Sequence, residues 1–147
     1  MDKDKFDRTI KLIDDAYKTV RMGSYAIDCI MDKIEDKKLE DLMHKQNKYY
    51  LESTNSIEAL APKYNHELND INFMAKGMSG ASINMKTMFN KESSHISEML
   101  IEGTTMGITT LIKERNDNND LDSDLLGIVD KIISYLERFV ESLKEFL

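Results

Sequence analysis

Acidic residues and one histidine come together at helical spacing between residues 92 and 102. Glu92 precedes His95 by three residues, Glu98 follows it by three, and Glu102 lies four further along. On a helix these side chains project from adjoining turns of one side. A carboxylate and an imidazole one turn apart can share a divalent cation, and di-iron carboxylate bundles use acid-x-x-His twice. The spacing therefore indicates a metal site, for iron, manganese or zinc, as one hypothesis.

A complete two-metal centre is not supported by the rest of the chain. Such a centre needs a second acid-x-x-His and further carboxylates drawn from four helices. Asp41 and His44 repeat the spacing, but the apolar positions around them predict that His44 lies mostly off the core. The last apolar segment, residues 125–146, offers no inward acid or histidine. The alternatives are a single, partly exposed metal site and a histidine that hydrogen-bonds to neighbouring acids or hydroxyls.

Methionine and glycine are concentrated in the same part of the chain. Residues 73–110 hold six of the ten methionines and four of the six glycines. Methionine fills irregular gaps in cores, and it also forms adaptable binding surfaces. The stripe is therefore either plain core or a face that contacts a partner helix, a second subunit or an apolar ligand. This face consists of Met85, Met88, Met99, Gly103 and Met106.

A second polar group falls on positions that should face the core. It comprises Tyr17, Ser24, Gln46 and Tyr50. Buried polar groups need partners, so an interior glutamine paired with tyrosine hydroxyls would fix the register of two helices. The alternative is that these residues line a ligand cavity opposite His95.

The elements that position these residues are helices. Apolar residues recur at alternating steps of four and three, which predicts amphipathic helices over about 4–36, from about 39 to the residue before Pro62, and from Asp122 or Ser123 onward. We call the row of core-facing positions on each helix its seam. In the order of the three helices, the seams are Phe6, Ile10, Ile13, Tyr17, Val20, Ser24, Ile27, Met31 and Ile34; Leu39, Met43, Gln46, Tyr50, Ser53, Ile57 and Leu60; and Leu125, Val129, Ile132, Leu136, Phe139, Leu143 and Phe146.

The helical signal of the third segment runs from about residue 70 to 116 and is interrupted once. Two glycines and two serines cluster between Gly77 and Ser82, which predicts a short helix over 71–78, a bend, and a helix over 82–116. Four amphipathic helices with short connections predict an all-α, antiparallel up-down-up-down four-helix bundle. The length of 147 residues fits one domain, 1–147.

Composition excludes several classes of partner. The chain is 41% hydrophobic and 32% charged, with a formal charge of −7, so nucleic acid and anionic membrane surfaces are not expected partners. Cys29 is the single cysteine, and the charged N-terminal residues contain no apolar leader, so we expect a cytoplasmic protein.

Motifs for catalysis are missing. The sequence has no nucleophile-elbow glycine pattern, and the run from Gly77 to Gly80 has neither a preceding strand nor the lysine of a phosphate loop. We therefore expect a protein that is not an enzyme and, apart from the divalent metal of the first hypothesis, no cofactor.

Four runs carry a resemblance to a known family. They are residues 21–27 (RMGSYAI), 74–79 (MAKGMS), 83–88 (INMKTM) and 94–107 (SHISEMLIEGTTMG). Over roughly residues 15–147 the chain resembles a family of small proteins of Firmicutes, especially clostridia, whose bundle is ferritin-like. The resemblance implies a ferritin-like four-helix fold and a bacterial cytoplasmic setting, and it implies no known activity. Ferritin-like metalloproteins carry paired acid-x-x-His motifs, whereas only Glu92 and His95 match one convincingly here.

The functional expectation follows from these observations. We expect a helical binding or assembly module that uses the methionine and glycine face of the third long helix. This face would contact another protein, a second copy of the chain or an apolar ligand. The alternative is a ferritin-like metal-binding protein with a site around Glu92, His95 and Glu102.

Overall fold

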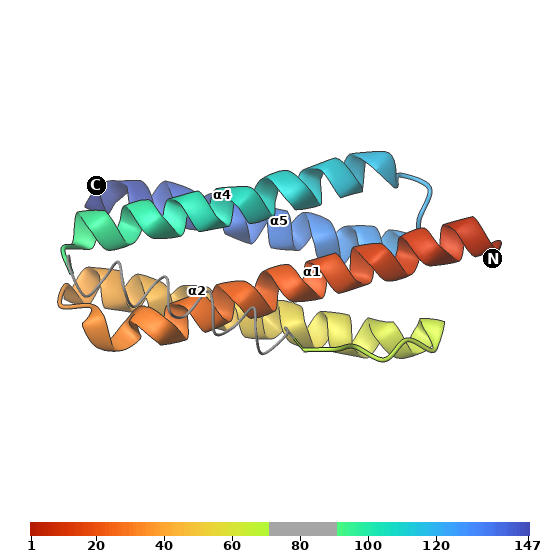
Figure 1. Cartoon of the computed structure of the whole chain (residues 1–147), viewed down its shortest axis with the longest axis horizontal. Coiled ribbons are helices and arrows are strands. Elements are labelled where there is room, and N and C mark those ends of the chain that lie inside the picture. The colour runs from red at the N-terminus through yellow and green to blue at the C-terminus, as the bar shows by residue number, and fades with distance from the viewer. Residues whose placement is uncertain (71–90) are drawn as a thin grey trace.

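The structure is a computed structural model, in which residues 1–70 and 91–147 are described. These two ranges form four long α-helices and three short 3-10 helices and contain no strand (Figure 1). The α-helices are α1 (Lys3–Ile30), α2 (Lys37–Leu60), α4 (Ser93–Asp117) and α5 (Ser123–Leu143). The 3-10 helices η1 (Met31–Lys33), η2 (Ala61–Tyr64) and η3 (Lys144–Phe146) each continue the end of an α-helix. The all-helical class predicted from the sequence is confirmed for this part of the chain.

Acidic caps define where α1 and α2 begin. The Asp2 carboxylate accepts a hydrogen bond from the backbone N–H of Lys5 at 2.8 Å. The Asp36 carboxylate accepts two, from the backbone N–H groups of Lys38 and Leu39. These bonds satisfy donors that have no partner within the first turn of a helix.

Polar contacts along α1 and α2 show how the two helices are aligned. The Asn47 amide donates to the Asp28 carboxylate at 3.2 Å, and the Tyr17 hydroxyl lies 3.5 Å from a Glu58 carboxylate oxygen. Residue numbers rise along one helix as they fall along the other, so α1 and α2 lie side by side and run in opposite directions (Figure 1).

The apolar core is contributed unequally by the four helices. Every predicted seam position of α2 is buried, and so is the α5 seam from Leu125 to Leu143. By contrast, α4 buries only Ile96, Ser97, Leu100 and Leu111, so none of residues 101–110 is buried. None of the described helices is long and apolar enough to cross a membrane.

Polar and aromatic contacts join α5 to its two neighbours. The Arg115 guanidinium donates to Asp130 from Nε at 2.8 Å, which links α4 to α5. The rings of Tyr49 and Tyr135 stack with centroids 4.1 Å apart, which links α2 to α5.

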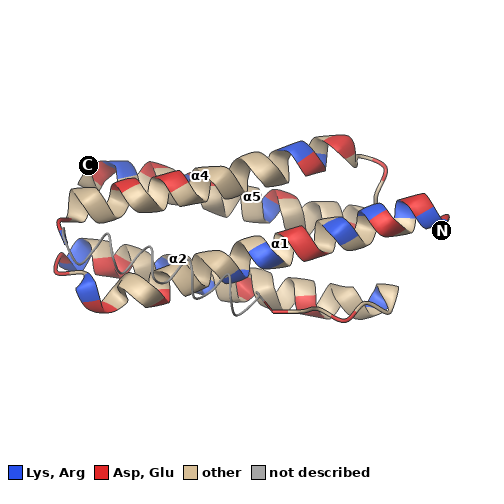
Figure 2. Cartoon of the chain, viewed as in Figure 1, with Lys and Arg blue, Asp and Glu red and all other residues tan. Residues whose placement is uncertain are grey.

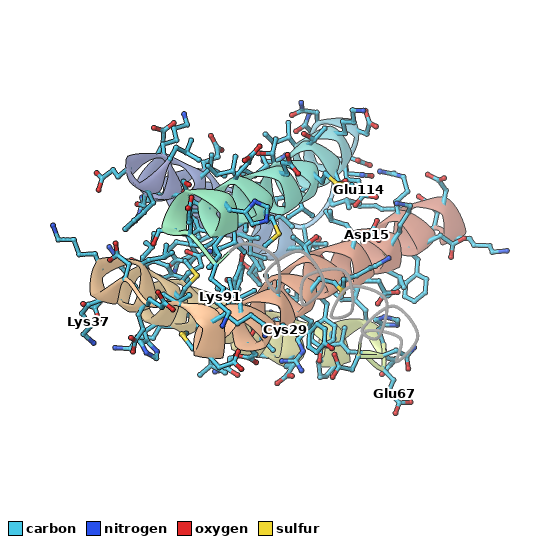
Figure 3. The ribbon with its side chains drawn as sticks, turned by 60° about the vertical axis from the view of Figure 1, so that its left-hand side comes forward. Asp15, Cys29, Lys37, Glu67, Lys91 and Glu114 are labelled. Atoms are coloured by element: carbon cyan, nitrogen blue, oxygen red, sulfur yellow. The ribbon has the colours of Figure 1, made fainter. Side chains whose placement is uncertain are left out.

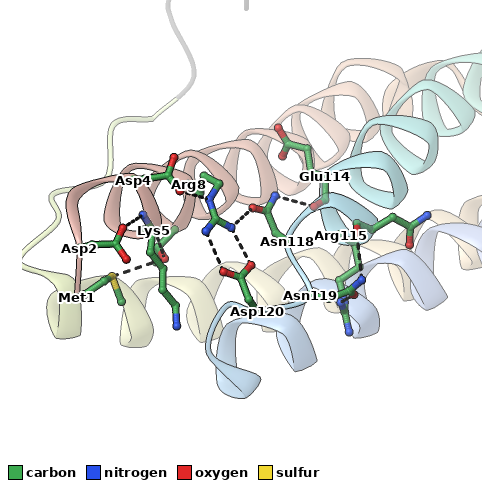
Figure 4. A network of polar contacts seen from close by, with 12 residues as sticks. Met1, Asp2, Asp4, Lys5, Arg8, Glu114, Arg115, Asn118, Asn119 and Asp120 are labelled. Atoms are coloured by element: carbon green, nitrogen blue, oxygen red, sulfur yellow. Dashed lines mark hydrogen bonds and ion pairs between the residues drawn. The ribbon is translucent and has the colours of Figure 1, made fainter.

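An ion-pair network ties the beginning of α1 to the loop between α4 and α5 (Figure 4). Two nitrogens of Arg8 donate to the two carboxylate oxygens of Asp120 at 2.8 Å each, and a further bond of 3.0 Å reaches Asn118. Arg8 Nε donates to Asp4 at 3.0 Å. These bonds hold the pKa of Asp120 at about 2. A two-pronged arginine–carboxylate pair fixes geometry as well as charge, so it sets where α1 starts relative to α4 and α5.

The first helix ends earlier than the sequence predicted. The prediction was a helix to residue 36, but α1 ends at Ile30, and Ile34 and Asp36 have extended backbones. The reason is the cap of the next helix. Asp36 can accept hydrogen bonds from the first turn of α2 only if its own backbone is not helical.

The third long helix begins later than predicted. The predicted start was residue 82, whereas α4 begins at Ser93 and residues 91 and 92 are not helical. Serine hydroxyls compete with the backbone for hydrogen bonds and favour the ends of helices. The prediction followed the apolar periodicity alone, so it placed Ser93 and Ser94 inside the helix. The short helix predicted over 71–78 lies outside the described residues.

One glycine on α1 lets an aromatic ring of α2 come unusually close. A methyl group built on Gly23 would lie 2.5 Å from Cζ, 2.6 Å from the hydroxyl oxygen and 2.9 Å from Cε2 of Tyr50. Any other side chain at residue 23 would therefore overlap this ring. Gly23 thus has a packing role, because it leaves room for the far end of a buried tyrosine.

We expect Gly23→Ala to destabilise the fold and Gly103→Ala to stabilise it. The new methyl at 23 must displace the Tyr50 ring, which should lower the free energy of unfolding by about 1–3 kcal/mol. A methyl at Gly103 meets nothing within 4 Å, so its higher helix propensity should raise that free energy by up to about 1 kcal/mol. Urea unfolding followed by circular dichroism measures both. Equal stability of the two variants would show that the Tyr50 ring is not held in place.

Candidate functional site

A groove of about 750 Å³ opens between α1 and α4. We call it the α1–α4 groove. Its α1 wall is formed by Asp15, Lys18, Thr19, Met22, Gly23, Ala26, Ile27 and Ile30, and its α4 wall by Met99, Leu100, Gly103, Thr104, Met106, Gly107 and Thr110. Tyr50 from α2 and Leu136 and Phe139 from α5 form the floor. Its lining is mainly apolar with a few polar groups, as in ligand sites.

Small residues on α4 create the open side of the groove. Among residues 1–70 and 91–147, no atom lies within 4 Å of where the Cβ of Gly103 would be, whereas a Cβ on Gly107 would lie 3.2 Å from Cγ2 of Thr19. Thus α4 touches α1 closely at Gly107 and leaves space at Gly103. Residues 103–112 carry no charge, and Figure 2 shows this uncharged stretch of α4. Met106 is 73% exposed, although it lines the groove.

The predicted methionine and glycine face divides into two parts. Met99, Gly103 and Met106 line the α1–α4 groove. Met85 and Met88 lie outside the described residues. Sequence reasoning placed Ile27 in the core-facing row and residues 21–27 in a family motif, but it did not assign the α1 residues to a binding site.

Contacts between α1 and α4 set the length and direction of the groove. Thr19 lies beside Gly107, and Lys11 forms an ion pair with Glu114, so these helices also run in opposite directions. The lining residues of α1 extend from Asp15 to Ile30. At a rise of 1.5 Å per residue, the groove is roughly 22 Å long.

The floor contains the hydroxyl of a buried tyrosine. Tyr50 is 4% exposed, and the side chain of Gln46 is the hydrogen-bonding neighbour that lowers the pKa of its hydroxyl. Within the described residues, Gln46 Nε2 has no hydrogen-bond partner. Burial dominates and raises the pKa of Tyr50 to about 12, so the phenol stays protonated at neutral pH.

The other two residues of the predicted polar layer behave differently. Tyr17 is buried, but its hydroxyl faces Glu58 on the outer side of the α1–α2 pair. Burial, and then the charge of Glu58, raises the pKa of Tyr17. Ser24 is half-buried. The structure therefore brings Gln46 and Tyr50 together and separates Tyr17 from them.

A carboxyl pair closes one end of the groove, where Asp15 on α1 faces Glu114 on α4 (Figure 3). Lys11 donates to both, at 2.7 Å to Asp15. Burial, and then the Asp15 carboxylate, raises the pKa of Glu114 to about 7. Burial also acts on Asp15, but its bonds with Glu114 and Lys11 outweigh that effect and lower its pKa. Sequence reasoning missed this pair, because charges on two distant helices give no local signal.

The predicted metal ligands do not converge on one point. Glu92, Glu98 and Glu102 are exposed, and His95 is half-buried with a buried Nε2 that has no hydrogen-bond partner in the described part of the chain. Across residues 1–70 and 91–147, no group of three or more histidine, cysteine, aspartate or glutamate side chains is placed to hold a metal ion. His44, of the second motif, pairs with Glu40 at 3.5 Å on the surface.

Comparison with known proteins gives no further assignment. No protein-family model matches the chain, and searches of curated proteins and of solved structures find no match either. The resemblance to a ferritin-like family therefore stays a prediction, and the function has to be argued from the groove itself.

Glu114 should make the stability of the fold depend on pH near neutrality. Its pKa is raised from an ordinary value of 4.5 to about 7, so its contribution is complete below about pH 4.5 and is lost as the pH rises through 7. The lowered pKa of Asp15 acts only at lower pH, near its ordinary value of 3.8. Between about pH 5 and pH 8, we expect the free energy of unfolding of wild type to decrease as the pH rises, and that of Glu114→Gln to decrease less.

Urea unfolding at several pH values measures this slope. Glu102→Gln removes one exposed negative charge from the same helix and serves as the control. A slope that is the same in wild type and Glu114→Gln would contradict the assignment of the carboxyl pair.

Proposed function

We propose that the protein binds an elongated apolar ligand in the α1–α4 groove and acts as a binding protein without catalysis. The observation that carries this proposal is the lining of the groove by Met99, Gly103 and Met106 over a buried floor. Its volume of about 750 Å³ falls within the range of small-molecule sites, roughly 300–1,000 Å³. Methionine adds side chains that adapt to the shape of a bound molecule.

The size of the groove favours a small molecule over a partner helix. A helix is 10–12 Å wide, so a 22 Å length of it occupies roughly 2,000 Å³. The width of such a helix would leave much of it outside a groove that lies between only two helices, α1 and α4. A flexible chain or a narrow planar molecule would be enclosed by the walls and would remove Met106 and Gly103 from water.

The fold and the cellular location that we propose are those that the sequence indicates. We propose a single-domain bundle of the antiparallel up-down-up-down, ferritin-like kind, located in the cytoplasm. The opposed directions of α1 with α2, and of α1 with α4, support the topology. The single cysteine, Cys29, supports a reducing compartment.

Diphenylhexatriene tests the binding function, because this elongated hydrocarbon becomes fluorescent when it leaves water. We expect wild type to bind it and Gly103→Leu to bind it at least about tenfold more weakly, a difference of about 1.4 kcal/mol. The leucine would fill space beside Gly103, where an added Cβ meets no atom of the described residues within 4 Å. Fluorescence titration gives the dissociation constants.

Gly127→Leu is the matched control for this experiment. Gly127 is also an exposed helix glycine with nothing within 4 Å of its Cβ position, but it lies on α5 and does not line the groove. Both substitutions should raise helix propensity by about 1 kcal/mol, so both proteins should stay folded. Absence of binding by wild type, or equal binding by the two variants, would overturn the proposed function.

A further inference from the structure

The charged residues in the lining of the α1–α4 groove lie together at one end of it. Asp15 and Lys18 are the first two residues that α1 contributes, and every other lining residue among the described ones is uncharged. From Thr19 to Ile30, the lining of the α1 wall continues for roughly 16 Å without a charge. The groove therefore has one charged end and a long uncharged remainder, a pattern that fits an amphipathic molecule.

The charge of Asp15 is already matched within the protein. Lys11 donates to the Asp15 carboxylate at 2.7 Å, and the Glu114 carboxyl group of α4 hydrogen-bonds to the same side chain. A positively charged group of a ligand would have to compete with Lys11 for this carboxylate. Asp15 is therefore not the group at this end of the groove that lacks a counter-ion.

Lys18 has no counter-ion of its own. Its side chain is exposed, and it forms neither an ion pair nor a hydrogen bond with the residues that the structure describes, 1–70 and 91–147. Its charge acts on the Asp15 carboxylate from one helical turn away, without a direct contact. Of the two charges at this end of the groove, the Lys18 ammonium group is the one that a ligand can pair with.

The uncharged remainder of the groove suits an alkyl tail. Met99, Leu100 and Phe139 line it, and the latter two are buried. An extended chain of about a dozen methylene groups spans the roughly 16 Å of lining beyond Lys18. Burial of such a tail supplies most of the affinity, because the hydrophobic effect grows with the apolar area removed from water. The charged end then decides which head group binds.

We infer that the groove takes a long-chain carboxylate, whose head pairs with Lys18 and whose alkyl tail runs along α1 toward Ile30. This inference rests on the proposed function and names its ligand class. The head lies at the exposed rim and keeps much of its water, so the pairing adds selectivity without burying a charge. One ammonium group matches one negative charge, and the nearby Asp15 carboxylate would repel the second charge of a phosphate.

Displacement of diphenylhexatriene by three compounds with the same tail tests the inference. Dodecanoate carries a negative head, dodecanol a neutral one and dodecylamine a positive one. We expect wild type to bind dodecanoate about three- to fivefold more tightly than dodecanol, the effect of one ion pair at an exposed rim. Dodecylamine should bind no better than dodecanol, because Asp15 is already paired with Lys11.

Two substitutions of Lys18 change the charge and leave the apolar lining intact. Lys18→Gln should bind dodecanoate and dodecanol equally, and Lys18→Glu should prefer dodecylamine to dodecanoate. Both should bind diphenylhexatriene, which has no head group, as wild type does. Lys113→Gln is the matched control, because Lys113 is also exposed but does not line the groove. This variant loses the same charge and should keep the wild-type preference for dodecanoate.

The outcomes separate this inference from the proposed function. If diphenylhexatriene does not bind wild type, both are overturned. If it binds but dodecanoate is not preferred to dodecanol, or the preference survives in Lys18→Gln, the groove stands and the head-group assignment is overturned.

Three further results bear on the head group alone. Tightest binding of dodecylamine by wild type would show that Asp15 pairs with the ligand and would overturn the inference. Equal loss of the preference in Lys113→Gln would show that it comes from the net charge of the protein, which overturns the inference as well. If Lys18→Gln does not fold, Lys18→Glu decides in its place: a preference for dodecylamine supports the inference, and one for dodecanoate overturns it.

Discussion

The contact between Gly23 and the Tyr50 ring is the constraint on which the groove depends. Because residue 23 has no side chain, the ring passes between α1 and the core and reaches the α4 side of the bundle. There its end forms part of the groove floor, together with Phe139. A side chain at residue 23 would block this path. One glycine therefore makes room for the Tyr50 ring against α1 and lets that ring form part of the groove floor.

The bundle is closed on three sides by apolar seams and on the fourth by polar contacts. The buried rows of α2 and α5 meet each other and the buried faces of α1 and α4. Lys11 forms an ion pair with Glu114 of α4, and Arg8 forms one with Asp120 in the loop that follows α4. Both lie toward one end of α1. The groove occupies the remaining length, where α4 supplies small residues in place of large apolar ones.

The regular part of this fold could be predicted from spacing alone. The α2 and α5 seams were predicted position by position, because a helix that faces a core repeats its apolar residues regularly. The end of α1 and the start of α4 were not, because periodicity does not register the hydrogen bonds by which Asp36 caps α2 or the extended backbone of Glu92 before Ser93.

The candidate site was predicted in separate parts. Met99, Gly103 and Met106 stand out as one face, and Tyr50 was an alternative cavity residue, but their meeting in one groove depends on the fit of Tyr50 against Gly23. The pairing of Asp15 with Glu114 likewise depends on how α1 and α4 are aligned. Alignment of distant helices is a tertiary property, and one sequence carries little information about it.

The composition of the α4 wall has a consequence for its motion. Six of the eight residues from Gly103 to Thr110 are glycine or threonine, which have poor helix propensity, and the hydroxyls of Thr109 and Thr110 bond back to carbonyls of the preceding turn. None of these residues is buried. Packing at Leu100 and Leu111 holds the helix at either side of this stretch. Local opening therefore costs least here, so the amide protons of this stretch should exchange with solvent sooner than those of α5. The α4 wall, which would contact a ligand, is therefore also the part of the bundle that can most easily change its conformation to fit that ligand.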